Sequence, residues 1–359
     1  MEKIKAAFAG FGAAAKFMHA PFIKTNPGYE IVSVLERNKS ESKELFPDAK
    51  IVRTYEELIS DENIELIIIT TPNDTHFSYT EQALRAGKNV VLEKPFTITS
   101  ADGLQLIEIA KQTSKILSVF HNRRYVADFL TISEILRNNI LGDIHSYEAH
   151  YHRYRPEAKP NAWREEPIAG SGIFYDLGSH LIDQVLYLFG LPQSVTADIR
   201  KQRPHARVDD CFIVWLNYGF LKVVLQSGML VREPGPRYMI HGTKGSFIKN
   251  GEDPQEAFLR AGKMPTEIEN WGMEKEESYA LLHTEINGNE IKKIYPSLKG
   301  DFGMYYENLY QTIRLNAPLR ERPEHGYNTI RIIELAFESS NKKQTIICNG
   351  LLNVAYPVL

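Results

Sequence analysis

The sequence has few cysteines, no long apolar run and no large excess of one charge. Only Cys211 and Cys348 occur in 359 residues, far apart and without CxxC spacing. This pattern argues against a disulfide framework or a zinc knuckle and favours a reducing compartment. No apolar stretch approaches the roughly 18 residues that span a bilayer, so we expect no membrane segment. A net charge of -3 provides no electrostatic footprint for nucleic acid or an anionic membrane.

The N-terminus begins like a secretory leader but does not continue as one. Residues 6–9 are apolar and follow two lysines, yet Gly10, Gly12 and Lys16 interrupt the run before any cleavage point. We therefore expect a cytoplasmic protein. A length of 359 residues exceeds the usual size of one domain, which favours two domains.

Short apolar segments alternate with helix-like segments over the first third of the chain. The expected strands cover residues 4–9, 31–35, 66–70, 89–92 and 116–120. The expected helices between them include residues 40–46, 77–86 and 100–112. This alternation predicts a parallel sheet with crossover helices, that is, a doubly wound Rossmann domain over residues 1–122.

The pattern changes after residue 122. Strand-like segments then follow one another without long helices between them, at residues 144–154, 194–200, 211–216 and 221–229. The expected helices are residues 177–189, 303–315 and 326–340, and residues 250–289 are expected to form surface loops. The pattern predicts an α+β domain with an open antiparallel sheet over residues 123–359, whose C-terminal helices can pack back on the first domain.

A glycine-rich turn follows the first expected strand. The residues from Gly10 to Ala15 match G-x-G-x-x-G/A, with Ala13 and Ala14 at the start of the next helix. The first glycine permits a tight turn, and Gly12 lets the backbone approach a pyrophosphate that faces the helix N-terminus. Gly10, Gly12, Ala13 and Ala14 are therefore candidate contacts of a dinucleotide. A glycine-rich loop that serves only packing is the alternative interpretation.

Two adjacent residues at the end of the second strand give opposite indications about the dinucleotide. Glu36 can accept hydrogen bonds from the adenosine ribose, which favours NAD. Arg37 can pair with a 2′-phosphate, which favours NADP, or stack on adenine. These residues alone leave NAD and NADP both open.

Two further motifs lie at the carboxyl ends of expected strands, the edge at which doubly wound sheets bind ligands. The candidate cofactor contacts there are Thr71, Pro72, Asn73, His76, Glu93, Lys94 and Pro95. Hydride transfer from a secondary alcohol places negative charge on oxygen, which a fixed Lys94 ammonium would stabilise. Pro95 would fix the backbone beneath the lysine, with a cis bond as one way to do so. Ordinary turns are the alternative interpretation of both motifs.

The densest group of polar residues lies at the start of the helix expected near residue 177. Asp176 and His180 are four residues apart, so one helix face would present both side chains. A histidine can act as general acid or base, and a neighbouring carboxylate can hold substrate hydroxyls and raise its basicity. Gly172 and Gly178 are expected to leave room for a ligand. The alternative is an N-capping aspartate and a core histidine.

A metal site is a further alternative. His150 and His152 alternate on an expected strand, and together with Asp176 and His180 they could bind a metal in a hydrolase. The spacing lacks the short intervals typical of metal motifs, so we expect no metal.

Taken together, the motifs resemble the Gfo/Idh/MocA family, the group of glucose–fructose oxidoreductase and inositol dehydrogenase. The resemblance rests on the G-x-G-x-x-A turn, the Thr71-Pro72-Asn73 turn, Glu93-Lys94-Pro95 and Asp176-x-x-x-His180, and it runs the full length. Residues 121–124, 153–156, 163–164, 170–172 and 176–180 look closest to the branch that contains NADP-dependent scyllo-inositol dehydrogenase.

The resemblance implies a dehydrogenase of a polyol, inositol or sugar that uses NAD(P), with a lean towards NADP. It implies that Lys94, Asp176 and His180 line the substrate site and that the histidine is the acid or base. Further substrate contacts would be Asn122, Arg123, Tyr154 and Trp163. The open sheet would build a homodimer or homotetramer. A non-catalytic, nucleotide-binding regulator of the same fold is the alternative, and the complete Lys/Asp/His set argues against it.

Overall fold

The backbone folds into two units, each assembled from three separate stretches of chain. The computed structural model describes residues 2–158 and 162–356. The first unit contains Met1–Tyr125, Pro254–Trp271 and Asp301–Tyr327. The second contains Val126–Asp253, Gly272–Gly300 and Asn328–Leu359. Among the described residues, no helix combines the length and the apolar character needed to cross a bilayer.

A parallel sheet of six strands forms the centre of the first unit. The strands are β1 (Ile4–Ala9), β2 (Tyr29–Leu35), β3 (Lys50–Val52), β4 (Leu66–Ile69), β5 (Asn89–Leu92) and β6 (Leu117–Val119). Their order in the sheet is β3-β2-β1-β4-β5-β6, the order of dinucleotide-binding doubly wound sheets. Every residue of the central β4 is fully buried, because helices cover both faces of such a sheet. The predicted Rossmann fold is thus confirmed.

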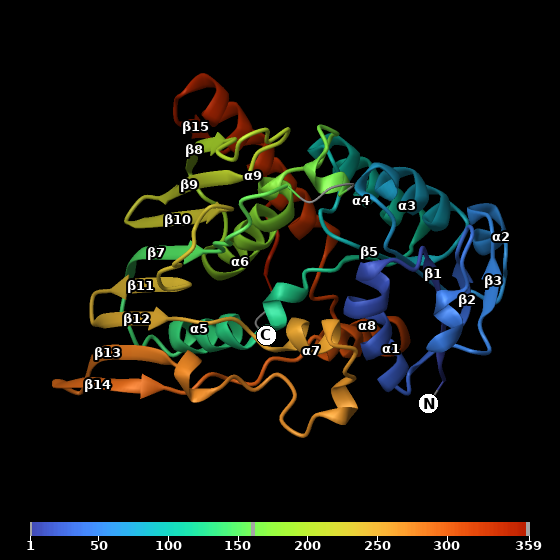
Figure 1. The fold of residues 1–359 in the computed structure, drawn as a ribbon, viewed down its shortest axis with the longest axis horizontal. Coiled ribbons are helices and arrows are strands. Elements are labelled where there is room, and N and C mark those ends of the chain that lie inside the picture. The colour runs from blue at the N-terminus through green and yellow to red at the C-terminus, as the bar shows by residue number, and fades with distance from the viewer. Residues whose placement is uncertain (1, 159–161, 357–359) are drawn as a thin grey trace. The chain divides into compact units, whose positions relative to one another are not determined.

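Helices flank this sheet on both sides (Figure 1). The helical segments of the first unit are η1 (Ala15–His19), α1 (Ala20–Thr25), η2 (Glu41–Glu44), α2 (Tyr55–Ile59), η3 (Asn73–Thr75), α3 (His76–Arg85), α4 (Ser100–Thr113), η4 (Asn122–Tyr125), α7 (Gln255–Arg260), η7 (Pro265–Glu267) and α8 (Gly303–Leu315). Helices α3 and α4 lie together on one face, and α1 and α8 lie on the other (Figure 1). The carboxyl ends of the strands and the turns that follow them remain as the ligand edge.

A nine-stranded sheet forms the second unit. Its strands are β7 (Ile144–His150), β8 (Ser194–Arg200), β9 (Cys211–Tyr218), β10 (Leu221–Gly228), β11 (Tyr238–Gly242), β12 (Gly245–Lys249), β13 (Ala280–Ile286), β14 (Asn289–Tyr295) and β15 (Ile346–Ile347). Their order is β14-β13-β12-β11-β7-β10-β9-β8-β15. Among the strand pairs that the described residues form in this sheet, β7 and β10 run parallel and the others run antiparallel. The predicted open, mainly antiparallel sheet is therefore confirmed.

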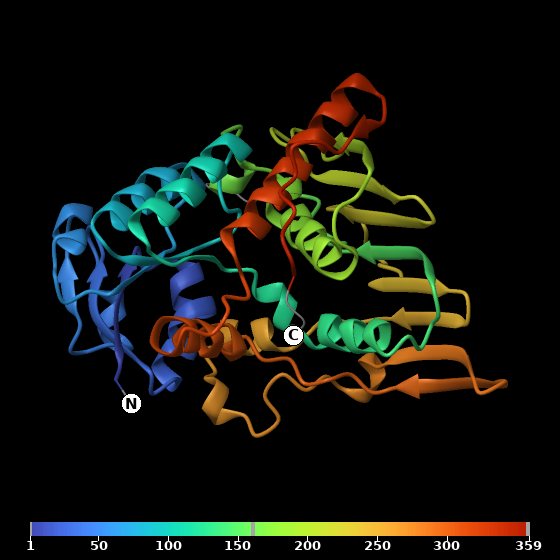
Figure 2. The same cartoon turned by 180° about the vertical axis from the view of Figure 1, so that it is seen from behind.

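One face of the nine-stranded sheet carries the helices of the second unit (Figure 2). These are α5 (Ala127–Arg137), η6 (Phe174–Gly178), α6 (Ser179–Phe189) and most of α9 (Pro323–Lys342), with short turns at η5 (Trp163–Glu165) and η8 (Glu276–Ser278). Tyr147 of β7 packs against Phe189 of α6, with ring centroids 5.4 Å apart. The amide of Ala197 in β8 donates to the Ser339 hydroxyl of α9 over 3.0 Å. The first contact holds α6 on the sheet, and the second holds α9.

The prediction of surface loops over residues 250–289 is wrong in part. The segment contains α7 and β13, and β13 pairs with β14 in an antiparallel hairpin. The turn between them is Asn287-Gly288, with φ angles of 53° and 79°. This pair of positive φ angles is what a tight hairpin turn requires. The chain there is rich in charge because β14 lies at the edge of the sheet.

Candidate active site

The glycine-rich turn leaves open space at one of its two glycines. Gly10 has a φ of +89°, and a Cβ there would lie 3.1 Å from the Thr71 side chain. A Cβ on Gly12 would meet no protein atom within 4 Å. Packing within the protein therefore does not require a glycine at position 12. Close approach of the backbone to a ligand would require one. The open side of the turn adjoins a helical stretch that begins at Ala13, the place where a Rossmann fold binds a pyrophosphate; contacts of these residues with a dinucleotide stay a prediction.

Two π-helical segments occur among the described residues, and each lies in one of the predicted motifs. Segment η1 follows the glycine turn, and η6 contains Asp176. Such widened turns are rare and frequently occur at functional sites. Neither segment could be predicted from the sequence, because a π turn depends on packing rather than on a local residue pattern.

The side chain of Glu36 points into the protein. Its carboxylate accepts hydrogen bonds from the amides of Glu41 and Ser42 at 2.9 and 3.0 Å, and from the Ser42 hydroxyl. Only 6% of the residue is exposed. Arg37 is exposed, and no described residue pairs with its guanidinium. Contacts of these two residues with a cofactor stay predictions.

Lys94 is held by a chain of buried hydrogen bonds that sequence analysis missed. Its amide donates to Oε2 of Glu93 over 2.9 Å, and Oε1 of Glu93 lies 2.9 Å from Nε2 of His19. The other ring nitrogen of His19 lies 2.5 Å from the Tyr306 hydroxyl of α8. Since a carboxylate only accepts, the His19 Nε2 must donate and the tyrosine can donate to Nδ1. The chain fixes the backbone that carries the lysine.

The Glu93 carboxylate in this chain is ionised despite its burial. Burial alone would raise its pKa, but the hydrogen bond from His19 and the charge of Lys94 outweigh that effect and lower the pKa. The Lys94–Pro95 peptide is cis. Glu93 is a predicted cofactor contact; in the structure its carboxylate hydrogen-bonds the backbone of the loop that carries Lys94.

His76 connects the two motifs at the ligand edge of the first unit. Its Nδ1 lies 2.9 Å from the Pro95 carbonyl oxygen, and its Nε2 lies 3.1 Å from the Thr71 carbonyl oxygen. The residue is 1% exposed, and burial lowers its pKa. Pro72 and the buried Asn73 form the turn between strand and helix. The structure therefore brings these predicted residues together with the lysine loop, and direct cofactor contacts remain a prediction.

The two predicted substrate contacts after β6 both lie in η4 of the first unit. Asn122 is buried at the start of η4. The Arg123 guanidinium pairs with the Glu256 carboxylate, which Arg260 also holds at 2.9 Å. Burial would raise the pKa of Glu256, but these arginines lower it to about 2. Arg123 is therefore part of an ion-pair network, and its contact with substrate stays a prediction.

Asp176 and His180 occupy one continuous helical stretch of the second unit. Asp176 lies in η6 and His180 in the first turn of α6. The Asp176 carboxylate lies 3.4 Å from Nε of Arg164 and 4.0 Å from Nη1 of Arg153. These two cations stabilise its ionised form. His180 is 6% exposed, so the surrounding protein restricts its ring.

The prediction that Gly172 and Gly178 leave room for a ligand is wrong. A Cβ on Gly172 would lie 2.1 Å from Oδ1 of Asp209, and one on Gly178 would lie 2.4 Å from the Phe174 ring. Both glycines make room for protein atoms. Oδ2 of Asp209 accepts the Phe174 amide hydrogen bond over 2.8 Å, so Asp209 anchors the start of the helical stretch. Burial raises the pKa of Asp209 to about 6.

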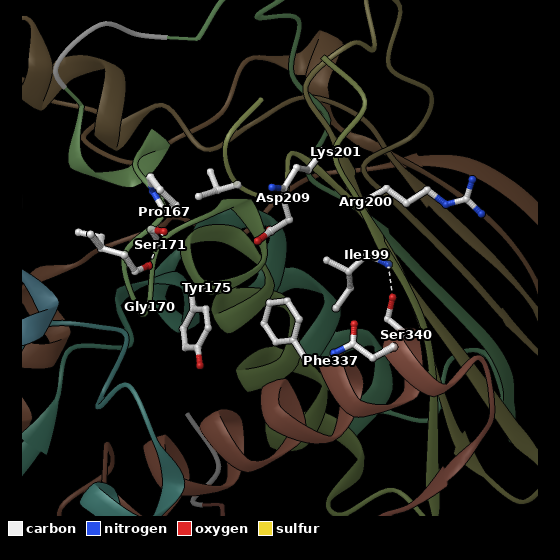
Figure 3. A pocket seen from close by; sticks show the side chains of 13 residues that line it. Pro167, Gly170, Ser171, Tyr175, Ile199, Arg200, Lys201, Asp209, Phe337 and Ser340 are labelled. Atoms are coloured by element: carbon white, nitrogen blue, oxygen red, sulfur yellow. Dashed lines mark hydrogen bonds between the residues drawn. The ribbon is translucent and has the colours of Figure 1, made fainter. Parts of the chain in front are cut away.

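A cavity of about 350 Å³ lies beside this anchor, on the second unit. Asp209, Tyr175 and Phe337 face it, with Arg200 and Lys201 at its border (Figure 3). Asp176 and His180 are not among the residues that line it. The cavity is therefore distinct from the predicted catalytic pair, and Asp209 is one of its lining residues.

The two predicted aromatic contacts of the second unit each stack with an arginine. Tyr154 is 43% exposed, and the guanidinium of Arg232 lies 3.9 Å from its ring centroid. Trp163 has the guanidinium of Arg164 at 4.5 Å. The neighbouring Glu165 is fixed by buried Arg203 over 2.6 Å. The two stacking contacts restrain the aromatic side chains themselves, and the part of these side chains in substrate binding stays a prediction.

The metal alternative finds no support in the geometry. The rings of His150 and His152 stack 5.5 Å apart, and Nδ1 of His150 lies 2.8 Å from the Pro236 carbonyl oxygen. Within residues 2–158 and 162–356, no three His, Cys, Asp or Glu side chains converge in a way that could hold a metal ion. The proposed set of His150, His152, Asp176 and His180 is therefore not assembled.

Comparison with known proteins agrees with the two-part architecture. Residues 4–121 match the profile of the oxidoreductase family's NAD-binding Rossmann fold, and residues 133–347 match that of its C-terminal α/β domain. The scyllo-inositol 2-dehydrogenase (NADP(+)) of Bacillus subtilis is 43% identical over 97% of this chain and 96% of its own length. The uncharacterized oxidoreductase YdgJ of Escherichia coli is 37% identical over 96% of this chain and 99% of its own.

Solved structures show the same fold over nearly the whole chain. Oxidoreductase yvaA from Bacillus subtilis superposes with a TM-score of 0.93 at 42% identity, over 96% of this chain and 98% of that one. An oxidoreductase from Bacteroides fragilis gives 0.89 at 44% identity, over 96% and 100%. With both family profiles matched in order, the chain belongs to the Gfo/Idh/MocA family of oxidoreductases, and its N-terminal domain is an NAD-binding Rossmann fold.

Proposed function

We propose that this oxidoreductase is an NADP-preferring dehydrogenase that acts on a secondary alcohol, or the matching ketone, of an inositol or related polyol. The Rossmann domain (1–122) would bind the dinucleotide, and residues 123–359 would supply the substrate side. The open space at Gly12 supports dinucleotide binding. The 43% identity to an NADP-dependent scyllo-inositol dehydrogenase supports the substrate class and the cofactor preference.

The proposal gives each catalytic residue one task. In the oxidation direction the carbinol C–H bond breaks and the hydroxyl proton leaves. When bound, the nicotinamide ring supplies the acceptor for the hydride. His180 takes the hydroxyl proton, and the Lys94 ammonium stabilises negative charge on the oxygen as it forms. Asp176 holds neighbouring hydroxyls of the polyol.

The observation that carries this proposal is the way the protein holds the backbone segments that bear these residues. The hydrogen-bond chain from Tyr306 through His19 and Glu93 ends on the backbone of Lys94. Asp209 anchors the helical stretch that carries Asp176. A site built for catalysis requires such support, because misplaced groups lose most of their effect.

A substrate screen tests the proposal. The purified protein is incubated with inositols, other polyols and sugars, each with NAD and with NADP, and reduction of the nicotinamide is followed by absorbance. We expect turnover of at least one cyclic polyol, faster with NADP. Absence of turnover with every polyol and both cofactors, while either dinucleotide binds, would favour the regulator.

We also propose that the nine-stranded sheet mediates a homodimer or homotetramer. Trp215 of β9 and Ile294 of β14 are 39% and 61% exposed, and an assembly through this sheet would bury such side chains. Light scattering coupled to size exclusion should give a mass of two or four chains, and Trp215→Glu should lower it. A monomeric wild type would contradict this assembly.

A further inference from the structure

Glu36 stands at the position where a Rossmann-fold acid usually selects NAD, yet the proposed function favours NADP. An acid that faces the adenosine ribose binds its 2′-hydroxyl and repels a 2′-phosphate. The contacts of Glu36 in this chain resolve the conflict, because they define a different task for the same carboxylate.

The Glu36 carboxylate is occupied by the turn that follows it. It accepts two main-chain amides, from Glu41 and Ser42, and the hydroxyl of Ser42, which is itself fully buried. Three donors on a side chain that is 6% exposed leave little capacity for a ribose. The negative charge of the Glu36 carboxylate therefore stabilises the first turn of η2 by accepting its donors.

Arg53 also holds the backbone between Glu36 and η2. Its Nη1 donates to the carbonyl oxygens of Glu36 and Lys39, each over 2.6 Å. Its Nη2 lies 3.3 Å from the Ser40 hydroxyl. The segment 36–40 is thus held by a carboxylate at its start and a guanidinium beside it, although it contains no regular structure.

The side chains that this fixed segment presents outward suit a phosphate. Arg37 is exposed, and no described residue pairs with its guanidinium. Lys39 is also exposed, although it already pairs with Glu41 over 2.7 Å. A free guanidinium on a rigid loop binds a phosphate through two parallel hydrogen bonds and loses little entropy in doing so.

We propose that Glu36 is a positioning residue that shapes segment 36–40 into a 2′-phosphate site, in which Arg37 makes the contact. The inference rests on the proposed dinucleotide function and deepens it. It reverses the effect expected of Glu36: removing the carboxylate weakens binding of the phosphorylated ribose, whereas removing an acid that faces the ribose would strengthen it.

Titration calorimetry with two cofactor fragments tests whether loss of the Glu36 carboxylate weakens or strengthens binding of the 2′-phosphate. Adenosine 2′,5′-bisphosphate carries the 2′-phosphate of NADP, and adenosine 5′-monophosphate lacks it. We expect the wild type to bind the bisphosphate more tightly. Glu36→Gln should weaken the bisphosphate about tenfold, the equivalent of one charge-assisted hydrogen bond, and affect the monophosphate at least threefold less. Arg37→Ala should show the same selectivity, and Asn38→Ala, an exposed neighbour, should change neither affinity by more than about twofold.

If Glu36→Gln fails to fold, Ser42→Ala tests the role of Glu36 instead. The Ser42→Ala variant loses only the hydroxyl donor to the Glu36 carboxylate, and its affinity for the bisphosphate should fall selectively by about threefold. Unchanged or tighter bisphosphate binding in the variant that folds, or equal losses of both ligands, overturns the role of Glu36. A wild type that prefers the monophosphate overturns the phosphate site alone. A wild type that binds neither fragment nor either whole dinucleotide overturns the proposed function itself.

Discussion

The Gly12→Ala variant tests whether Gly12 is required for dinucleotide binding or for the stability of the fold. The new Cβ would meet no protein atom within 4 Å, and Gly12 is not among the glycines with positive φ. Alanine therefore fits the native backbone. Replacing glycine at such a position stabilises a protein by about 0.4–1 kcal/mol, because the unfolded chain loses conformational freedom. We expect the free energy of unfolding of the variant to be equal to or slightly above that of the wild type.

The same methyl group should obstruct the dinucleotide. It occupies the space into which the pyrophosphate must come to bind the backbone amides. Loss of one hydrogen bond to a charged group costs about 1.5–3 kcal/mol, which corresponds to an affinity roughly 10- to 100-fold weaker. Stability and affinity should thus change in opposite directions. Urea unfolding followed by circular dichroism measures the first, and titration calorimetry with NADP measures the second.

Gly172→Ala is the matched control, because at that site the structure predicts the reverse. Its Cβ would lie 2.1 Å from Oδ1 of Asp209, and its φ of +88° is strained for alanine. We expect a loss of stability of about 2 kcal/mol or more, with NADP affinity retained. A Gly12→Ala variant that loses stability and keeps its NADP affinity would refute the assignment of the open space to the cofactor.

Further variants test the catalytic residues and their surroundings. Lys94→Ala should lower kcat by about 10²-fold. His180→Ala should lower it by roughly 10²–10⁴-fold and remove the ionisation near neutral pH from the rate profile; an unchanged profile would assign the base to another group. Exhaustive chelation should leave activity intact, whereas loss of activity with loss of stoichiometric zinc would contradict the hydride mechanism. Burial raises the pKa of Asp209 from 3.8 to about 6, so its ionisation costs stability as pH rises from 4 through 6. Asp209→Asn should therefore gain about 2 kcal/mol relative to wild type between pH 4 and pH 7, and parallel stability curves would disprove the burial effect.

The architecture could be predicted because its signals are local. A parallel strand buried on both faces must be apolar throughout, and the Leu-Ile-Ile-Ile run at 66–69 has that property. The hairpin of β13 and β14 had an equally local signal in Asn287-Gly288, which a search for tight turns would have found.

The details of the site depend on contacts that no local pattern records. Gly172 makes room for the Asp209 carboxylate, which lies far along the chain, so its small size did not mark a space for a ligand. The support of Lys94 by His19 and Tyr306 joins residues from opposite ends of the sequence. The composition and spacing of residues around Lys94 therefore predicted its chemistry but not the groups that hold it.

The last stretch of chain in the first unit is Asp301–Tyr327, so this unit cannot complete its fold until late in synthesis. Helix α8 supplies Tyr306, which hydrogen-bonds His19 and whose carbonyl accepts from the Tyr29 hydroxyl. Until the ribosome has released that helix, buried groups of the Rossmann sheet lack their partners. At about 5–20 residues per second, the roughly 200 residues from Tyr125 to Tyr327 take on the order of 10–40 s. The nascent nucleotide-binding domain therefore spends that interval incomplete, and a fragment that ends at residue 122 should bind chaperones rather than cofactor.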